Sequence, residues 1–306
     1  MVCVSLFYEE RVETMSVILQ NGLLKRDAFM FGEYQLLQPT LNILIVNLMP
    51  NRLQTEKQFI GLLMKLSVNV RLTFAVPATH QIKHETEQIV QNYVTLADIW
   101  DRHFDGLIVT GAPVDRTKFE KIDYWQEFKR LLAWRKTHVK ESLFACWAVY
   151  GAGYAERNFP VRHITSKISG VYRTNDILNR RSTLTTGLNH ITMPHSRYFT
   201  IPNQGLPRRL KVAGDNKLGA FVLRDELLHS TYVTGHLEYD TETLAEEYQR
   251  DLAKGIVTRE PENYLIDGQP RNNWAADADK FFVNWGKMLL ASTKNSSVIN
   301  LIPALN

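Results

Sequence analysis

A single cysteine near the middle of the chain, Cys146, has the sequence context of a nucleophile. The apolar run Ser142–Cys146 predicts a buried strand, and the small residues between Ala148 and Gly153 would let a following helix pack close beneath it. A thiol at a helix N-terminus has a lowered pKa, because the positive end of the helix dipole stabilises the thiolate. A cysteine buried only for packing has the same pattern, so Cys146 alone does not establish catalysis.

A histidine and a glutamate two residues apart follow a second expected strand. The run Ser230–Thr234 leads through Gly235 to His236 and Glu238. In extended backbone such residues share a face, so we expect Glu238 to orient His236 while the other ring nitrogen addresses a nucleophile. A surface turn with an incidental histidine has the same pattern.

A glycine turn follows a third expected strand, Asp105–Val109. The amide of Gly111 or Ala112, together with the amide of Trp147, would form an oxyanion hole, although an ordinary tight turn has the same sequence. The three strand ends together predict thiol-based acyl transfer or hydrolysis, with donor and acceptor both undefined.

The elements that must position these residues alternate along the chain. Further buried strands are expected at Leu41–Met49 and Val68–Ala75, and amphipathic helices at Thr55–Leu66 and Tyr124–Lys136. This alternation predicts an α/β fold, a mostly parallel sheet with helices on both faces. In such sheets ligands bind at the carboxyl ends of the strands, where all three motifs fall.

We expect one catalytic α/β domain over residues 41–292, preceded by a divergent segment over residues 1–40 and followed by a peripheral tail over residues 293–306. The stretch Lys167–Pro207 is punctuated by glycine and proline, and predicts an insertion or a loop-rich lid.

Composition excludes several classes of function. The 306 residues carry a net charge of +4 from 36 basic and 32 acidic side chains spread along the chain, which does not indicate a nucleic-acid partner. The only cysteines, Cys3 and Cys146, have no spacing typical of disulfides or of a metal site, so no metal is expected. Neither a signal peptide nor a membrane span is evident, which favours a cytoplasmic protein.

Several short segments become specific when they are taken together. They are Val46–Pro50, Thr55–Phe59, Phe104–Pro113, Asp123–Trp125, Cys146–Trp147, Lys167–Tyr172, Pro194–Tyr198, Val233–His236, Glu238–Asp240 and Glu247–Asp251. Jointly they resemble the homoserine O-succinyltransferases and O-acetyltransferases, from about Leu41 to about Trp285. The resemblance implies a class I glutamine amidotransferase-like fold and a homodimer.

The resemblance also implies a ping-pong reaction without a cofactor, in which acetyl-CoA or another acyl-CoA is a co-substrate. Cys146 would carry the acyl group, with His236 as the base and Glu238 as its orienter. Lys167, His195, Ser196 and Arg197 would surround the acyl and acceptor pocket. The ammonium and carboxylate of the acceptor would bind Glu247 and Arg250, an assignment that suits a bidentate guanidinium.

Asp115 bears on the acyl donor. Similar enzymes carry glycine at this position when they use succinyl-CoA and glutamate when they use acetyl-CoA, so a carboxylate favours acetyl transfer by repelling the succinyl carboxylate. Succinyl-CoA remains an alternative, because aspartate is shorter than glutamate and Arg116 is adjacent.

The acceptor stays open between L-homoserine, for methionine biosynthesis, and L-serine, for cysteine biosynthesis. The chain departs from the family pattern at Asn51, Arg52, Tyr150 and Leu237, and one methylene is worth only about 1 kcal/mol in an apolar pocket. A glutamine amidohydrolase-like cysteine hydrolase would share the same catalytic residues and is a further alternative.

Overall fold

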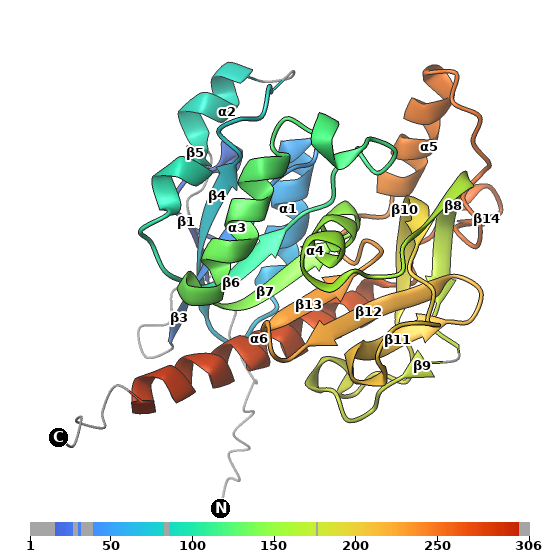
Figure 1. Cartoon of the computed structure of the whole chain (residues 1–306). Coiled ribbons are helices and arrows are strands. Elements are labelled where there is room, and N and C mark those ends of the chain that lie inside the picture. Colours follow the sequence, from blue (N-terminus) through green and yellow to red (C-terminus); the bar gives the residue numbers. More distant parts are fainter. Residues whose placement is uncertain (1–15, 27–29, 32–38, 83–85, 176, 300–306) are drawn as a thin grey trace, which may run out of the picture.

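The computed structural model describes residues 16–26, 30–31, 39–82, 86–175 and 177–299 (Figure 1). Within these residues, eleven strands form one sheet in the order β2-β1-β4-β3-β6-β7-β13-β12-β11-β9, with β5 beside β4. The neighbours from β1 to β13 pair in parallel, and β12, β11 and β9 extend the sheet beyond β13, each antiparallel to the strand before it. The expected α/β architecture with a mostly parallel sheet is confirmed.

The bounds of the strands agree with the buried runs of the sequence to within a few residues at the sheet centre. The strands of the sheet are β1 (Val17–Leu19), β2 (Met30–Phe31), β3 (Thr40–Val46), β4 (Asn69–Val76), β5 (Val94–Thr95), β6 (Phe104–Val109), β7 (Val139–Ala145), β9 (Ile177–Leu178), β11 (Lys211–Asp215), β12 (Gly219–Asp225) and β13 (Ser230–Val233). The helices are α1 (Arg52–Leu63), α2 (Thr86–Asn92), α3 (Trp125–His138), α4 (Trp147–Arg157), α5 (Thr243–Ala253) and α6 (Ala275–Ile299).

Two hydrophobic cores lie on opposite faces of the sheet, because side chains alternate along each strand. On β3, Ile43 packs with α1 and α6, whereas the adjacent Leu44 packs with α3 and α4. Phe59 and Trp285 belong to the first core and Trp147 to the second, and all three are buried. Helices therefore cover both faces, as the near-continuous apolar strands require (Figure 1).

The stretch expected to be a loop-rich lid contains regular structure instead. Strands β8 (Arg162–Arg173) and β10 (Thr192–Thr200) form a separate antiparallel two-stranded sheet, with His195 opposite Gly170 and Ser196 opposite Ser169. A short hairpin of β14 (Leu265–Ile266) and β15 (Gln269–Pro270) lies near it, beyond α5 (Figure 1). The two-stranded sheet supplies one wall of the site described below.

The two terminal segments that we expected outside the catalytic domain both contain residues that pack with it. β1, from the segment expected over residues 1–40, joins the parallel sheet beside β4, while residues 1–15, including Cys3, lie outside the described residues. Helix α6 runs through the boundary expected at residue 292, and residues 300–306 of the expected tail lie outside the described residues. The division into one catalytic domain and two flanking segments stays a prediction.

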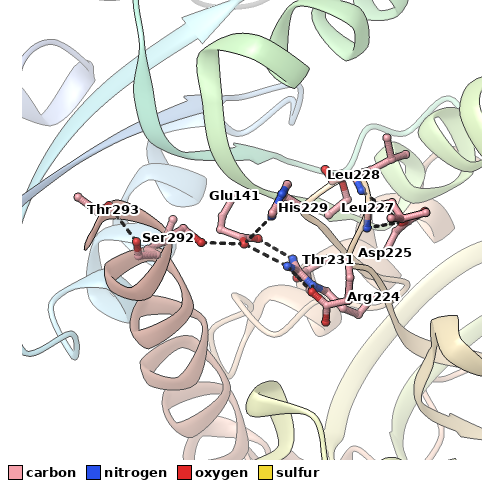
Figure 2. A network of polar contacts seen from close by, with 12 residues as sticks. Glu141, Arg224, Asp225, Leu227, Leu228, His229, Thr231, Ser292 and Thr293 are labelled. Carbon is pink, nitrogen blue, oxygen red and sulfur yellow. Dashed lines mark hydrogen bonds and ion pairs between the residues drawn. The ribbon is translucent and has the colours of Figure 1, made fainter. Parts of the chain in front are cut away.

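A buried polar network fixes the C-terminal half of α6 to the end of the sheet at which the parallel strands begin (Figure 2). Glu141 near the start of β7 accepts two hydrogen bonds from the Arg224 guanidinium, at 2.5 and 3.0 Å, and one from the Ser292 hydroxyl at 3.2 Å. Glu141 and Arg224 are only 2% and 4% exposed. This ion pair therefore ties three distant parts of the chain together.

No helix of the described residues is both long enough and apolar enough to cross a membrane.

Candidate active site

The carboxyl ends of four neighbouring strands, β3, β6, β7 and β13, meet at a cavity of about 420 Å³. Cys146 and His236 reach it from two of these ends, and Ala112 and Met49 from the other two. The side chains at its mouth come from β8, β10 and α5. The prediction that the motifs meet at one edge of the sheet is confirmed.

The main chain at Cys146 turns sharply between β7 and α4. Cys146 has φ 47° and ψ −113°, a conformation that is rare for residues with a side chain, and its amide donates to the Val233 carbonyl at 2.8 Å. The thiol is thereby held at the helix N-terminus, with only 6% of the residue exposed.

His236 and Glu238 form a hydrogen-bonded pair beside Cys146. The Nδ1 atom of His236 lies 2.7 Å from Oε1 of Glu238, which leaves Nε2 directed away from the carboxylate. The two meet through a turn at Leu237 and Glu238 rather than through the extended backbone we expected. Burial lowers the pKa of His236, but the neighbouring Cys146 and Glu238 outweigh it and raise this pKa well above its ordinary value.

Replacing Glu238 by glutamine should lower the pKa of His236, because a carboxylate that stabilises the imidazolium is lost. The ring can be titrated by ¹³C NMR after histidine labelling. His163, which accepts from or donates to Tyr150 at 3.0 Å, serves as the internal reference. An unchanged His236 titration in the glutamine variant would contradict the electrostatic role of Glu238.

Three main-chain amides, those of Gly111, Ala112 and Trp147, belong to residues that lie beside Cys146 or His236. No main-chain carbonyl of the described residues accepts from the amides of Gly111 and Ala112, and Trp147 is the first residue of α4, where amides lack helical partners. A Cβ on Gly111 would lie 3.1 Å from Cε1 of His236 and 3.3 Å from Cβ of Cys146. A side chain at this position would therefore press on both Cys146 and His236, and glycine avoids these close contacts.

One wall of the cavity carries alternating charges. Asp115 accepts from the Tyr198 amide at 2.7 Å, and burial raises the pKa of its carboxyl although Lys167 acts in the opposite direction. Lys167 donates to Asp251 at 2.7 Å, while Ser196 lines the cavity beside them. The cavity wall thus presents a carboxylate, an ammonium group and a hydroxyl.

Helix α5 supplies a second pair of charges. The Arg250 guanidinium lies 3.7 Å from Oε1 of Glu247, and its NH2 donates to Asp251 at 3.0 Å. The other oxygen of Glu247, Oε2, is buried and has no partner among the described residues. Both side chains also line a second cavity of about 670 Å³, together with Met49 and Pro50, so the two cavities adjoin.

Two expected pocket residues, His195 and Arg197, lie behind the cavity instead of lining it. Both are fully buried, and Arg197 donates to the carbonyls of Phe199 at 2.9 Å and Leu218 at 3.3 Å. Burial lowers the pKa of Arg197 to about 10. Ser196 and Tyr198 of the same strand point into the cavity.

Two further residues of the site were absent from the sequence interpretation. Tyr239 stacks on the His236 ring with centroids 4.1 Å apart, and Asp251 joins Lys167 to Arg250. Both lie inside the segments that carried the family resemblance, but neither has a type or spacing that indicates a role by itself.

Sequence comparisons identify the family of the chain. A sequence model of the family described as "Homoserine O-succinyltransferase" matches residues 32–295. The chain belongs to the homoserine O-succinyltransferase family. Among the relatives of this chain, a homoserine O-acetyltransferase of Leuconostoc mesenteroides subsp. mesenteroides is 63% identical over 292 residues, covering 95% of each chain. A homoserine O-acetyltransferase of Bacillus subtilis (strain 168) is 35% identical over 251 residues, 79% of this chain and 83% of that protein.

Solved structures agree with the fold expected for this member of the homoserine O-succinyltransferase family. A glutamine amidotransferase from Thermotoga maritima aligns over 84% of this chain and 98% of its own, with a TM-score of 0.50 and 13% identity. A glutamine amidotransferase from Methylobacillus flagellatus aligns over 83% and 94%, with a TM-score of 0.50 and 9% identity. The expected class I glutamine amidotransferase-like fold is confirmed.

Proposed function

We propose that this chain is a homoserine O-acetyltransferase that transfers an acetyl group from acetyl-CoA to L-homoserine through a thioester on Cys146. The observation that carries the proposal is the arrangement of Cys146, His236 and Glu238 at a cavity that also contains Glu247 and Arg250. A nucleophile, a base and an orienting carboxylate there adjoin a pair of charges complementary to an amino acid.

The first half-reaction acylates the enzyme. The Cys146 thiolate attacks the acetyl carbonyl, and the amides of Gly111 or Ala112 and of Trp147 donate to the developing oxyanion. The carbon–sulfur bond to coenzyme A then breaks, and the departing thiolate takes the proton of the His236 imidazolium. Cys146 is left as an acetyl thioester and His236 as a neutral base oriented by Glu238.

The second half-reaction transfers the acetyl group. His236 takes the proton of the acceptor hydroxyl as its oxygen attacks the thioester carbonyl, and the bond to Cys146 breaks. The thiolate and the imidazolium are thereby restored. Glu247 and Arg250 hold the acceptor's ammonium and carboxylate during this step, and Lys167 and Ser196 line the same cavity.

Homoserine as the acceptor and acetyl as the transferred group are both supported by the names of the two relatives described above. Asp115 also supports the donor, because it lines the same cavity as Cys146. A free succinyl carboxylate would meet this charge.

Removing the charge of Asp115 should admit succinyl-CoA. Two like charges about 4 Å apart repel by about 4 kcal/mol at an effective dielectric near 20, and solvent and Lys167 reduce this. We therefore expect Asp115→Asn to raise kcat/KM for succinyl-CoA relative to acetyl-CoA by about tenfold or more. Asparagine keeps an acceptor for the Tyr198 amide, and Asp115→Glu, which keeps the charge, is the matched control. Equal selectivity of the two variants would show that charge is not the cause.

The decisive experiment is a matrix of acetyl-CoA and succinyl-CoA against homoserine and serine, read by coenzyme A release and product mass. We expect rapid turnover only with acetyl-CoA and homoserine. Faster turnover with succinyl-CoA would show that the proposed donor is wrong, and faster turnover with serine would show that the proposed acceptor is wrong. Ammonia from glutamine, without coenzyme A release in any combination, would identify a cysteine hydrolase instead.

The proposal includes the remaining expectations from the family resemblance. The reaction needs no metal or other cofactor, since acid–base and nucleophilic groups of the chain suffice for acyl transfer. We also propose a cytoplasmic homodimer whose product enters methionine biosynthesis.

A further inference from the structure

Tyr239 lies between the two functional halves of the site. Its ring stacks on His236, with centroids 4.1 Å apart and an interplanar angle of 20°. Its hydroxyl donates to Oε1 of Glu247 at 3.0 Å. One rigid phenol therefore contacts the imidazole at one end and the carboxylate of α5 at the other.

The position of Tyr239 is fixed from several sides. The residue is only 4% exposed, and its main-chain carbonyl accepts from Nε1 of the buried Trp274 at 3.0 Å, just before α6. Burial and the nearby Glu247 carboxylate raise the pKa of Tyr239 well above its ordinary value, so the phenol keeps its proton. The hydroxyl is thus a permanent donor to Glu247.

The remaining oxygen of Glu247 is free for a ligand. Oε2 is buried without a partner among the described residues, and Glu247 lines both cavities. A buried carboxylate oxygen that lacks a donor is costly, and an ammonium ion satisfies it. The stacked phenol therefore holds the oxygen that would bind an amino group at a fixed separation from the imidazole that activates a hydroxyl.

We propose that Tyr239 is a positioning residue that sets the chain length of the amino-acid acceptor by fixing the separation of His236 and Glu247. This rests on the proposed function, because it concerns the second half-reaction of that same site. Homoserine carries one methylene more than serine between its ammonium group and its hydroxyl. A fixed separation suits one of the two lengths, whereas a pocket that merely buries the extra methylene discriminates weakly.

Tyr239→Phe tests the role of the hydroxyl while keeping the stacked ring. We expect the ratio of kcat/KM for homoserine to kcat/KM for serine to fall at least about fivefold, with most of the change in the KM for homoserine. The acylation half-reaction, read as the burst of coenzyme A release from acetyl-CoA without an acceptor, should change by a smaller factor than the homoserine reaction.

The matched control is Tyr264→Phe, which also removes one buried tyrosine hydroxyl beside α5. That hydroxyl donates to the Thr241 carbonyl and accepts from the Ala245 amide at 3.2 Å, and Tyr264 does not line either cavity. Its loss should lower stability but keep the homoserine-to-serine ratio. Thermal unfolding of both variants separates misfolding from altered recognition.

Glu247→Gln provides a second route to the same answer. If Tyr239 acts through Glu247, the changes in the homoserine-to-serine ratio in the two single variants will not multiply in the double variant. Each single substitution already disrupts the hydrogen bond between Tyr239 and Glu247, so the second one removes nothing further. Multiplicative effects, an unchanged ratio in Tyr239→Phe, or an equal loss in acylation and with both acceptors would each overturn the inference. A wild-type chain that acetylates neither amino acid would instead overturn the proposed function.

Discussion

Replacing Cys146 by alanine should abolish acyl transfer while the fold is retained. With no nucleophile, the acetyl group has no thioester to form, and loss of a catalytic nucleophile typically costs at least about a thousandfold in kcat. The expected result is no burst of coenzyme A release and no acetyl adduct by intact-mass spectrometry. Alanine keeps the Cβ of Cys146, so it adds no new strain at φ 47°.

Two controls make the result for Cys146 specific. Thermal unfolding of Cys146→Ala should resemble that of the wild-type chain, because only one partly enclosed sulfur atom is removed. Ser292→Ala, at the far end of the molecule in the Glu141 network, should leave the burst intact. Substantial turnover by the alanine variant would show that Cys146 is a packing residue and that the transfer mechanism is wrong.

Replacing Arg224 by methionine should destabilise the fold by about 3–5 kcal/mol, because Glu141 would keep a buried charge without its partner. Glu141 is 2% exposed and accepts its two shortest hydrogen bonds from this guanidinium (Figure 2). Urea unfolding followed by circular dichroism measures the loss. Activity per folded molecule should be retained, since Glu141 lies near the start of β7 and Cys146 directly follows its other end.

The matched control for Arg224 is Lys140→Met. Lys140 pairs with Asp105 at 2.8 Å, but its side chain is 31% exposed, and such pairs contribute about 0–1 kcal/mol. The double variant Arg224→Met with Glu141→Gln should recover part of the stability by removing the uncompensated charge. A double variant as unstable as Arg224→Met alone would indicate that the arginine acts by packing rather than by charge.

The central strands and their ends could be predicted because burial on both faces leaves an apolar run in the sequence. The run before Cys146 became β7, and the runs before Gly111 and His236 became β6 and β13. Once these strands are neighbours in a parallel sheet, their following residues must meet. The meeting of Cys146, His236 and Gly111 at one place was thus accessible from local patterns.

The wall formed by β8 and β10 was not accessible in the same way. Pro194 obscures the strand signal of β10, in which successive side chains alternate, so Ser196 and Tyr198 reach the cavity while His195 and Arg197 are buried behind it. A period of two would have separated these pairs, but only after the segment was recognised as extended. Antiparallel pairing with β8 is a long-range contact without a local signal.

The contacts of α5 and α6 also depend on tertiary structure. The polar stretch after Ser292 resembles a tail, yet Ser292 and Thr293 hydrogen-bond to Glu141 and Asp105 as α6 continues. Tyr239 contacts His236, which follows β13, and Glu247, which lies in α5. Sequence spacing does not encode such contacts between elements.

The backbone conformation of Cys146 has an evolutionary consequence. A non-glycine residue at φ 47° and ψ −113° costs on the order of 1–3 kcal/mol, which a glycine at this position would relieve. A lineage released from selection for catalysis would therefore gain folding stability from the single replacement Cys146→Gly. Under the proposed mechanism, the thiol is therefore presented at this turn at a cost in folding stability.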